Sequence, residues 1–414
     1  MELETYSIGV GDRFEHQGEA QLQALKKFKD QHIEVVPVWN KSHREHEIIG
    51  TKPTSVREES ESAVENLNWQ GSYYIDADHI GLDNVDLFMD SSNYFTLDVA
   101  DMIGEEAEHE EIEGFVDKYK KYTTKKELPD ELEKMTINED KIRNIARKYL
   151  RAVKEAGQIY RHIESKKGKG DFITEVSMDE TENPQTPLEM FFILAAIAEE
   201  NIPAQTIAPK FSGEFYKGID YVGDEEAFAR EIKADLEVIE YAVNEFGLPD
   251  NLKISIHSGS DKFSIYGPIR KMLDETGAGL HIKTAGTTWL EELHGLILAG
   301  EEGLEFVKKI YKEALERIDE LSAPYKDVIN IERSNLPSGN EIDDFSKQKL
   351  AGMLVHNTEN KLYNVDLRQL LHLSYKLPAE NLSNYYSLLE KHEEVIAEQV
   401  TKNIYRHLRK VFPH

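Results

Sequence analysis

The sequence alternates short apolar runs with longer amphipathic segments along most of its length, and this alternation constrains the fold more than any other feature. Apolar runs of strand length, bounded by turn residues, precede segments whose apolar residues recur with helical spacing. We expect eight strands, at residues 6–10, 33–39, 73–76, 172–176, 204–208, 252–257, 280–282 and 328–331. Eight strands alternating with helices are typical of an α/β fold of the TIM type, the (β/α)8 barrel.

Two segments do not follow the alternation. Residues 98–138 are acidic and lack strand character, so we expect a helical insertion after strand 3. Residues 336–414 are largely helical in pattern and predict a C-terminal helical extension packed on the barrel. The sequence has no internal repeat and no low-complexity linker. We therefore expect one catalytic barrel domain, residues 1–335, followed by this extension.

The composition excludes several classes of function. The chain has 78 acidic and 49 basic residues, and a net charge of −29 disfavours nucleic acid and anionic membranes as partners. An acidic substrate would therefore need a local basic pocket. The absence of cysteine excludes disulfides, thiolate metal sites and cysteine nucleophiles. No signal-peptide pattern or long apolar run is present, so we expect a cytoplasmic protein, and a homo-oligomer is compatible with the sequence.

Polar side chains follow several of the predicted strands, most densely where residues 252–257 run into the loop His257-Ser-Gly-Ser-Asp-Lys262. In an α/β barrel all strands end at the same face, and catalytic side chains lie there. Histidines and carboxylates from different strands could hold a divalent cation such as Zn²⁺, Mn²⁺, Co²⁺ or Ni²⁺ at that face. A single His or Glu more often has a structural role, so the prediction depends on their convergence. The predicted metal ligands are His79, His257, His281 and Glu175.

Two resemblances to known families narrow the function. Asp78-His79 and His257-Ser-Gly-Ser260 resemble strand ends of metal-dependent class II aldolase barrels, where the Asp is an acid/base and the His binds the metal. A more extensive resemblance is to the tagaturonate epimerase family. It is carried by GDRFEHQG (residues 11–18), PKFSGEFYKGID (209–220), HSGSDKF (257–263) and RQLLHLSYK (368–376). It covers most of the chain and is weakest in the acidic segment. It implies a barrel, a divalent metal and a ketohexuronate substrate.

The chemistry of these substrates agrees with the residues at the strand ends. Tagaturonate and fructuronate differ at a carbon one bond removed from the carbon next to the ketone, so simple enolisation cannot invert it. We expect cleavage and re-formation of the adjoining C–C bond, a retro-aldol/aldol epimerisation in which the metal acts as a Lewis acid. Asp78 or Glu175 would transfer the hydroxyl proton. Lys210, Lys262 and Lys283 are candidates to hold the substrate carboxylate.

The expected site therefore has catalytic and substrate-binding groups beside the metal ligands. Catalytic roles are predicted for Asp78, Glu175 and Lys210. Substrate contacts are predicted for Arg13, His16, Gln17, Ser258, Ser260, Lys262, Lys283 and His372. Three alternatives remain open: a class II-type aldolase that releases its fragments, an epimerase or isomerase of a related ketose, and a sugar-binding barrel without activity.

Overall fold

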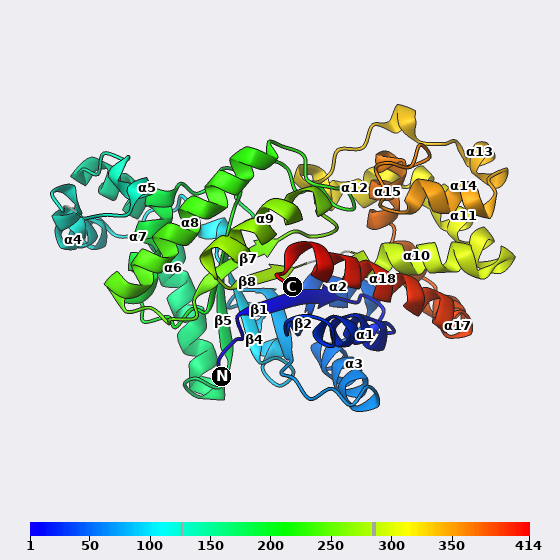
Figure 1. The fold of residues 1–414 in the computed structure, drawn as a ribbon, viewed down its shortest axis with the longest axis horizontal. Helices are drawn as coiled ribbons and strands as arrows, with labels where there is room; N and C mark the ends of the chain where they lie inside the picture. Colours follow the sequence, from blue (N-terminus) through cyan, green and yellow to red (C-terminus); the bar gives the residue numbers. More distant parts are fainter. Residues whose placement is uncertain (126, 284–286) are drawn as a thin grey trace.

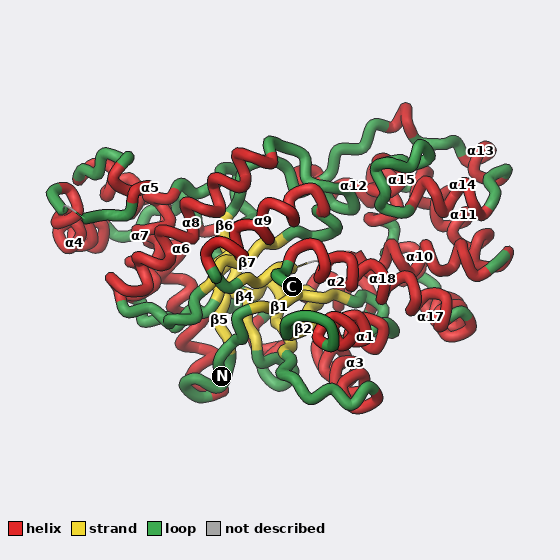
Figure 2. Tube along the Cα trace, in the orientation of Figure 1, coloured by secondary structure: helices red, strands yellow, loops and turns green. Residues whose placement is uncertain are grey.

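Eight parallel strands close into a barrel in sequence order in the computed structural model, which describes residues 1–125, 127–283 and 287–414 (Figures 1 and 2). The strands are β1 (Tyr6–Gly11), β2 (Val36–Ser42), β3 (Tyr74–Ile80), β4 (Tyr94–Asp98), β5 (Ile173–Met178), β6 (Thr206–Pro209), β7 (Lys253–His257) and β8 (Leu280–Lys283). Pairing of β8 with β1 closes the ring. The predicted (β/α)8 barrel is confirmed.

Helices surround the barrel and bury its outer face. Those of the barrel region are α1 (Gly18–Lys29), α2 (His43–Ile49), α3 (Pro53–Asn66), α6 (Glu139–Lys167), α7 (Pro187–Glu199), α8 (Glu225–Phe246), α9 (Phe263–Thr276), α10 (Thr287–Ala299), α11 (Glu301–Glu316) and α12 (Ile318–Ser322). Asn138, Thr186 and Asp224 each accept backbone N–H bonds at the start of the helix that follows. Such caps satisfy donors that have no partner within the helix and mark where it begins.

Two of the predicted strand assignments need correction. The sequence pattern did not indicate β4, so the insertion follows the fourth strand and not strand 3. The predicted strand at residues 328–331 is wrong, because this segment has no strand structure. Its polar backbone groups bond elsewhere: Val328 O accepts from Lys217 N, and Asn330 bonds to the side chain of Gln369. Because one strand was missed and another was predicted wrongly, the predicted number of eight strands still agrees with the structure.

The acidic insertion packs on the outside of the barrel. It contains α4 (His109–Tyr119) and α5 (Asp130–Glu133), which lie at one end of the molecule (Figure 1). Glu113 pairs with Arg143 of α6 at 2.7 Å, and Glu111 pairs with Lys154 of the same helix. Part of the acidic face predicted from the sequence is therefore balanced by basic side chains of the longest helix.

The C-terminal segment is helical and returns to the barrel. Its helices are α13 (Gly339–Asp343), α14 (Lys347–Leu354), α15 (Val365–Leu373), α16 (Lys376–Ala379), α17 (Leu382–Lys391) and α18 (Glu393–Val411). Helix α18 packs against α1, α9 and α10 and buries Ile396, Val400, Ile404 and Leu408. The extension thereby shares its core with the barrel, and the boundary at residue 335 stays a prediction.

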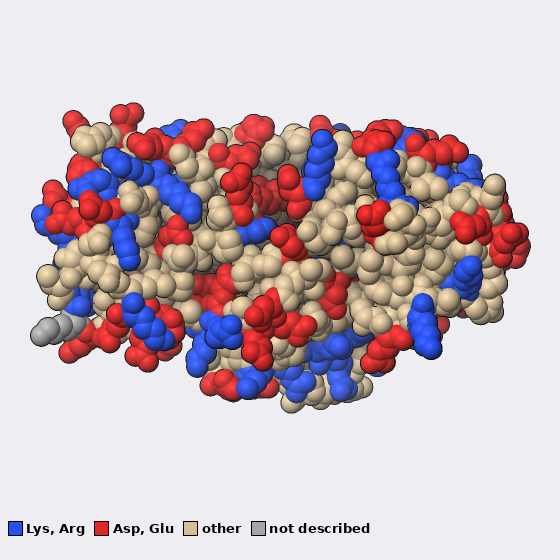
Figure 3. All heavy atoms as spheres, turned by 90° about the horizontal axis from the view of Figure 1, so that it is seen from above, with Lys and Arg blue, Asp and Glu red and all other residues tan. Residues whose placement is uncertain are grey.

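The surface reflects the acidic composition. In Figure 3, Asp and Glu are interspersed with Lys and Arg over the face shown, and acidic side chains flank a recess near its centre. Among the described helices, none is long and apolar enough to cross a membrane.

Candidate active site

His79 lies on a bulge at the end of β3. The pairing of β3 with β4 shifts by one residue between Ala77 and Ile80, so Asp78 and His79 share one position of the ladder. His79 has a φ of 54°, in the left-handed region that non-glycine residues seldom adopt. Alternation would send two successive side chains to opposite faces of the sheet. The bulge redirects the chain, and Asp78 Oδ1 and His79 Nδ1 instead lie 2.9 Å apart.

Three side chains at the barrel mouth can bind one metal ion together. The ligand atoms of His79, Asp179 and His257 all lie within 4.8 Å of one another. Asp179 Oδ1 lies 3.1 Å from His257 Nδ1 and 3.6 Å from His79 Nε2. Both nitrogens are buried and have no hydrogen-bond partner in the described part of the chain. Two such imidazole nitrogens facing one carboxylate match the donors that divalent transition metals prefer, and three protein ligands leave positions for a substrate.

The second nitrogen of each histidine is held by another carboxylate. Asp78 Oδ1 bonds to His79 Nδ1 at 2.9 Å, and Glu175 Oε1 bonds to His257 Nε2 at 2.8 Å. Carboxylates in this position orient histidine ligands and make them better donors to a metal. Glu175, predicted as a ligand, is therefore placed behind His257, while Asp179 lies beside the two free nitrogens.

Lys283 lies among three carboxylates. Its Nζ is 2.7 Å from Asp76 Oδ2, 2.9 Å from Asp78 Oδ1 and 3.1 Å from Glu175 Oε1. Burial opposes charge on this lysine, but the three acids raise its pKa well above the ordinary value. Burial raises the pKa of Asp76 to about 6. One ammonium among three acids leaves negative charge that a divalent cation would offset.

Burial and nearby charges act in opposite directions on the pKa values of His257 and Asp179. Burial opposes the charge of His257, but Asp179 and Glu175 outweigh it and raise the pKa of His257 to about 9. Burial also opposes ionisation of Asp179, yet His257 and His79 hold its pKa well below the usual range. The carboxylates of Asp179 and Glu175 thus stabilise positive charge at His257.

His281, predicted as a ligand, does not join this group. It lies two residues before the end of β8, its Nδ1 is 2.8 Å from Ser7 Oγ, and its ring packs against Tyr94. Burial lowers its pKa to about 3, so it is neutral at physiological pH. Asp179, which the prediction missed, is the first residue after β5. Its place at a strand end was the signal that could have found it.

A pocket of about 590 Å³ opens beside the metal-binding group. The pocket lies at the ends of β5, β6 and β7, which are followed by Asp179, Lys210 and the loop after His257. Lys217 and Arg44 also line it. Phe211 and Phe215 contribute apolar wall. A pocket that combines metal ligands, charged side chains and aromatic rings can hold a small polar ligand.

The predicted contacts in the β7 loop are mostly engaged within the protein. Ser258 Oγ donates to Lys283 O at 2.5 Å. Lys262 Nζ donates to Ser260 Oγ at 2.8 Å and to Tyr216 O at 3.1 Å. Burial lowers the pKa of Lys262 to about 7. These residues stabilise the loop after His257 and do not line the pocket.

The predicted contacts from the first and last motifs also lie outside this pocket's lining, which contains none of Arg13, His16, Gln17 and His372. Arg13 pairs with Glu45 at 2.7 Å. His16 and Gln17 donate their backbone N–H groups to Asp12, and His372 is buried. Their roles in substrate binding stay predictions.

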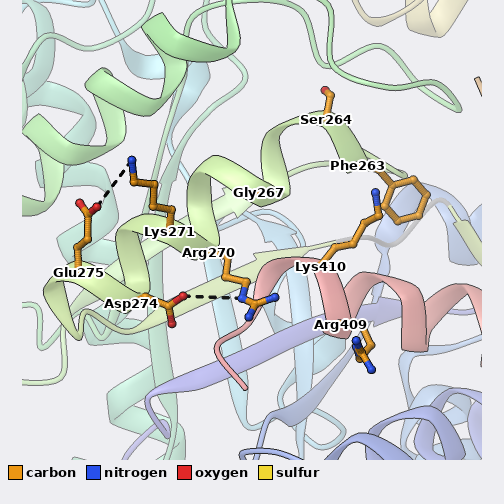
Figure 4. A pocket seen from close by; sticks show the side chains of 9 residues that line it. All are labelled: Phe263, Ser264, Gly267, Arg270, Lys271, Asp274, Glu275, Arg409 and Lys410. Carbon is orange, nitrogen blue, oxygen red and sulfur yellow. Dashed lines mark ion pairs between the residues drawn. The ribbon is translucent and has the colours of Figure 1, made fainter.

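Another hollow, of about 680 Å³, lies on the outer surface between α9 and α18 (Figure 4). Arg270 and Lys271 form ion pairs with Asp274 and Glu275 of the same helix at 3.8 and 3.9 Å. No histidine lines this hollow. Its chemistry does not support catalysis, although its volume is the larger.

Known proteins resemble this chain over nearly its whole length. A family model of tagaturonate epimerases (UxaE) matches residues 1–411. The tagaturonate/fructuronate epimerase of Thermotoga maritima is 29% identical over 421 residues, which cover 97% of this chain and 80% of that protein. The fructuronate-tagaturonate epimerase UxaE of Cohnella laeviribosi is 24% identical, and its one-glycerol crystal structure has a TM-score of 0.79 over 99% of this chain and 82% of that chain. Its native crystal structure gives 0.76 over the same shares.

Proposed function

Because the chain belongs to the tagaturonate epimerase family, whose members are isomerases, we propose that it interconverts D-tagaturonate and D-fructuronate by a metal-dependent retro-aldol/aldol reaction. The observation that carries the mechanism is the convergence of His79, Asp179 and His257 at the barrel mouth. Their two free imidazole nitrogens and one carboxylate fit a divalent cation of the zinc, manganese, cobalt or nickel type.

Cleavage and re-formation of a C–C bond can invert a carbon whose C–H is not acidified by the ketone. When the hydroxyl at the carbon to be inverted loses its proton, that carbon becomes an aldehyde, the adjoining C–C bond breaks and its electron pair moves into an enediolate of the ketone half. The aldehyde turns, the electron pair re-forms the bond on its other face, and the proton returns to the oxygen. A divalent cation held by His79, Asp179 and His257 would supply Lewis-acid stabilisation of the negative charge that develops on the ketone oxygen.

Asp78 is better placed than Glu175 to transfer the hydroxyl proton. Both oxygens of Glu175 are engaged, Oε1 by His257 and Oε2 by Tyr94, and its side chain is fully buried. Asp78 uses Oδ1 for its bonds to His79 and Lys283, and its side chain is 13% exposed. Burial opposes its ionisation, but Lys283 and His79 hold its pKa well below the usual range, so the carboxylate of Asp78 is ionised.

The remaining residues bind and orient. His79, His257 and Asp179 would hold the cation, and Glu175 would fix the ring of His257. Lys283 balances the carboxylates behind them. Lys210, the first residue after β6, lines the pocket and is available for substrate contact.

The proposal is tested by supplying metal-loaded protein with each hexuronate separately and following both by NMR. We expect the two reactions to reach the same ratio of tagaturonate to fructuronate from opposite sides. Accumulation of dihydroxyacetone in stoichiometric yield would instead indicate the class II-type aldolase, which uses the same site but releases its fragments.

A further inference from the structure

Basic side chains without an acidic partner gather in the pocket beside the candidate metal site. Arg44, Lys210 and Lys217 line it, and none of the three forms an ion pair within the described part of the chain. The acidic lining residues are Asp179, Glu180, Glu182, Glu214 and Asp327. In a chain with 78 acidic and 49 basic residues, unpaired ammonium groups at such a place are available to an anionic ligand.

The backbone at Lys217 is fixed by distant parts of the chain. Lys217 N donates to Val328 O at 2.8 Å, and Gly218 N donates to Ser260 Oγ at 3.0 Å. Gly218 O accepts from Nε of the buried Arg368. The loop after β6 is therefore held to the β7 loop and to the C-terminal extension at the position of this lysine. A fixed backbone limits the positions that the Lys217 ammonium can reach.

The side chain of Lys217 reaches the loop that follows β7. A Cβ built on Gly259 would lie 3.5 Å from Lys217 Nζ. Gly259 is two residues after His257, in the loop that begins at the candidate metal ligand, and both residues line the same pocket. The ammonium of Lys217 and two of the candidate metal ligands, Asp179 and His257, therefore line one pocket.

The other lysines of the site are committed to internal partners. Lys283 contacts three carboxylates, and Lys262 is fully buried and donates to Ser260. Arg44 is on the exposed surface, where its guanidinium lies 5.0 Å from the ring centre of Tyr325. Lys210 and Lys217 are half-buried and have no such partner.

We propose that Lys217, assisted by Lys210 in the same pocket, binds the substrate carboxylate and retains the aldehyde fragment between C–C cleavage and re-addition. This inference rests on the proposed function. The carboxylate belongs to the half of the substrate that becomes the aldehyde, whereas the ketone half interacts with the metal site. After cleavage, the aldehyde half is held through its carboxylate while it turns. Retention of this fragment distinguishes an epimerase from an aldolase.

The test compares metal-loaded wild-type protein with Lys217→Met and Lys217→Arg. Lys326→Met is the matched control, because Lys326 is an exposed lysine between the pocket residues Tyr325 and Asp327 but does not line the pocket. We expect Lys217→Met to raise KM for both hexuronates on the order of 10- to 100-fold, the usual effect of losing a charged hydrogen bond. Free dihydroxyacetone should increase relative to epimerised product. Lys217→Arg should restore most of the KM, and the control should behave as wild type.

The outcomes separate this inference from the proposed function. Wild-type protein that does not interconvert the hexuronates overturns both. Active wild-type protein with a KM for Lys217→Met within about threefold, or with equal losses in Lys217→Met and Lys217→Arg, overturns only the carboxylate anchor, since a charge contact must respond to charge. Circular dichroism verifies folding, and Lys217→Gln replaces Lys217→Met under the same criteria if the latter does not fold.

Discussion

Each histidine of the candidate metal site uses its two ring nitrogens for different purposes. One nitrogen bonds to a carboxylate behind it, Asp78 for His79 and Glu175 for His257, and the other is buried beside Asp179 without a hydrogen-bond partner in the described chain. The first contact sets the orientation of the ring, and on the second nitrogen a metal ion would replace the proton. At the scale of single residues, this division of roles is the main support for metal binding.

The set of metal ligands is tested by comparing two variants, one at Asp179 and one at His281. We expect Asp179→Ala to lose most of its bound metal during dialysis, whereas His281→Asn should retain it, because His281 bonds to Ser7 and lies outside the converging group. Metal content of the dialysed proteins, measured by mass spectrometry, decides the question. Metal loss from His281→Asn with retention by Asp179→Ala would favour the ligand set predicted from the sequence.

The role of Asp78 is tested by Asp78→Asn at saturating metal. An amide preserves the size of the side chain but cannot accept the hydroxyl proton, so kcat should fall by roughly 10²- to 10⁴-fold. Glu175→Gln should mainly weaken metal binding, by about 10- to 100-fold, since Glu175 lies behind His257. A larger loss of kcat in Glu175→Gln than in Asp78→Asn, both loaded with metal, would assign the proton transfer to Glu175.

Individual residues were predictable where they end a strand with a distinctive pair. Asp78-His79 and His257 lie at strand ends, where the sequence pattern places them, although the bulge at the pair has no sequence signal of its own. Asp179 lies in a loop rich in acidic residues, where composition does not distinguish a ligand from a solvated side chain. Lys217 owes its position to contacts with Val328 and Ser260, which are remote in the sequence.

At the scale of elements, Asp261 connects the β7 loop to the C-terminal extension. Its fully buried carboxylate accepts from Arg368 Nη2 at 2.6 Å, from His407 Nε2 at 2.8 Å and from His356 Nδ1 at 3.0 Å. These partners belong to α15, to α18 and to the segment after α14. The loop that begins at His257 is thus held by elements from the end of the chain.

Removal of this carboxylate should destabilise the fold. We expect Asp261→Ala to lower the free energy of unfolding by about 3–5 kcal/mol, because the buried Arg368 would lose its counter-charge. Urea denaturation followed by circular dichroism measures the effect. Asp344→Ala, at an exposed position, is the control. A difference below about 1 kcal/mol would show that the cluster contributes little to stability.

The same carboxylate predicts a dependence of stability on pH. Burial opposes its ionisation, but Arg368 and the two histidines hold its pKa well below the usual value. A carboxyl whose pKa is lowered by folding stabilises the protein above its unfolded-state pKa of about 3.9, and this contribution is lost as the pH falls towards the folded-state value. The stability difference between wild type and Asp261→Asn should therefore shrink below about pH 4. A constant difference would contradict this assignment.

The hydrophobic pattern of the sequence predicts some helices and strands well and others poorly. Long helices such as α6 and α8 are recognisable in the sequence, because burial of one helical face imposes an apolar pattern over many turns. The short strand β4 was missed between polar and acidic neighbours. Residues 328–331 have strand composition but bond to Lys217 and Gln369, and such tertiary partners are not visible in a local pattern.

At the scale of the whole molecule, the C-terminal extension completes the surface of the barrel. The apolar face of α18, which includes Ile396 and Val400, covers α1 and α10. A chain that ends at His392 lacks α18 and would expose the apolar surfaces of α1 and α10 to water. We expect that chain to lose cooperative thermal unfolding, because burial of each large apolar side chain contributes roughly 1.5–3 kcal/mol. Lys402→Ala, on the exposed side of α18, should unfold as wild type does. Cooperative unfolding of the shortened chain at the wild-type temperature would show that the extension is dispensable.

The barrel as a whole followed from the alternation of strands and helices, and its active face from the rule that catalytic groups lie at the strand ends. The metal-dependent aldol mechanism is the central claim, and its most direct measurement is NMR of the hexuronates in deuterated water with chelated and metal-reloaded protein. The account predicts interconversion only after reloading, with no solvent deuterium at the inverted carbon, because its C–H bond is never broken. Full activity of the chelated protein, or deuterium at that carbon, would contradict it.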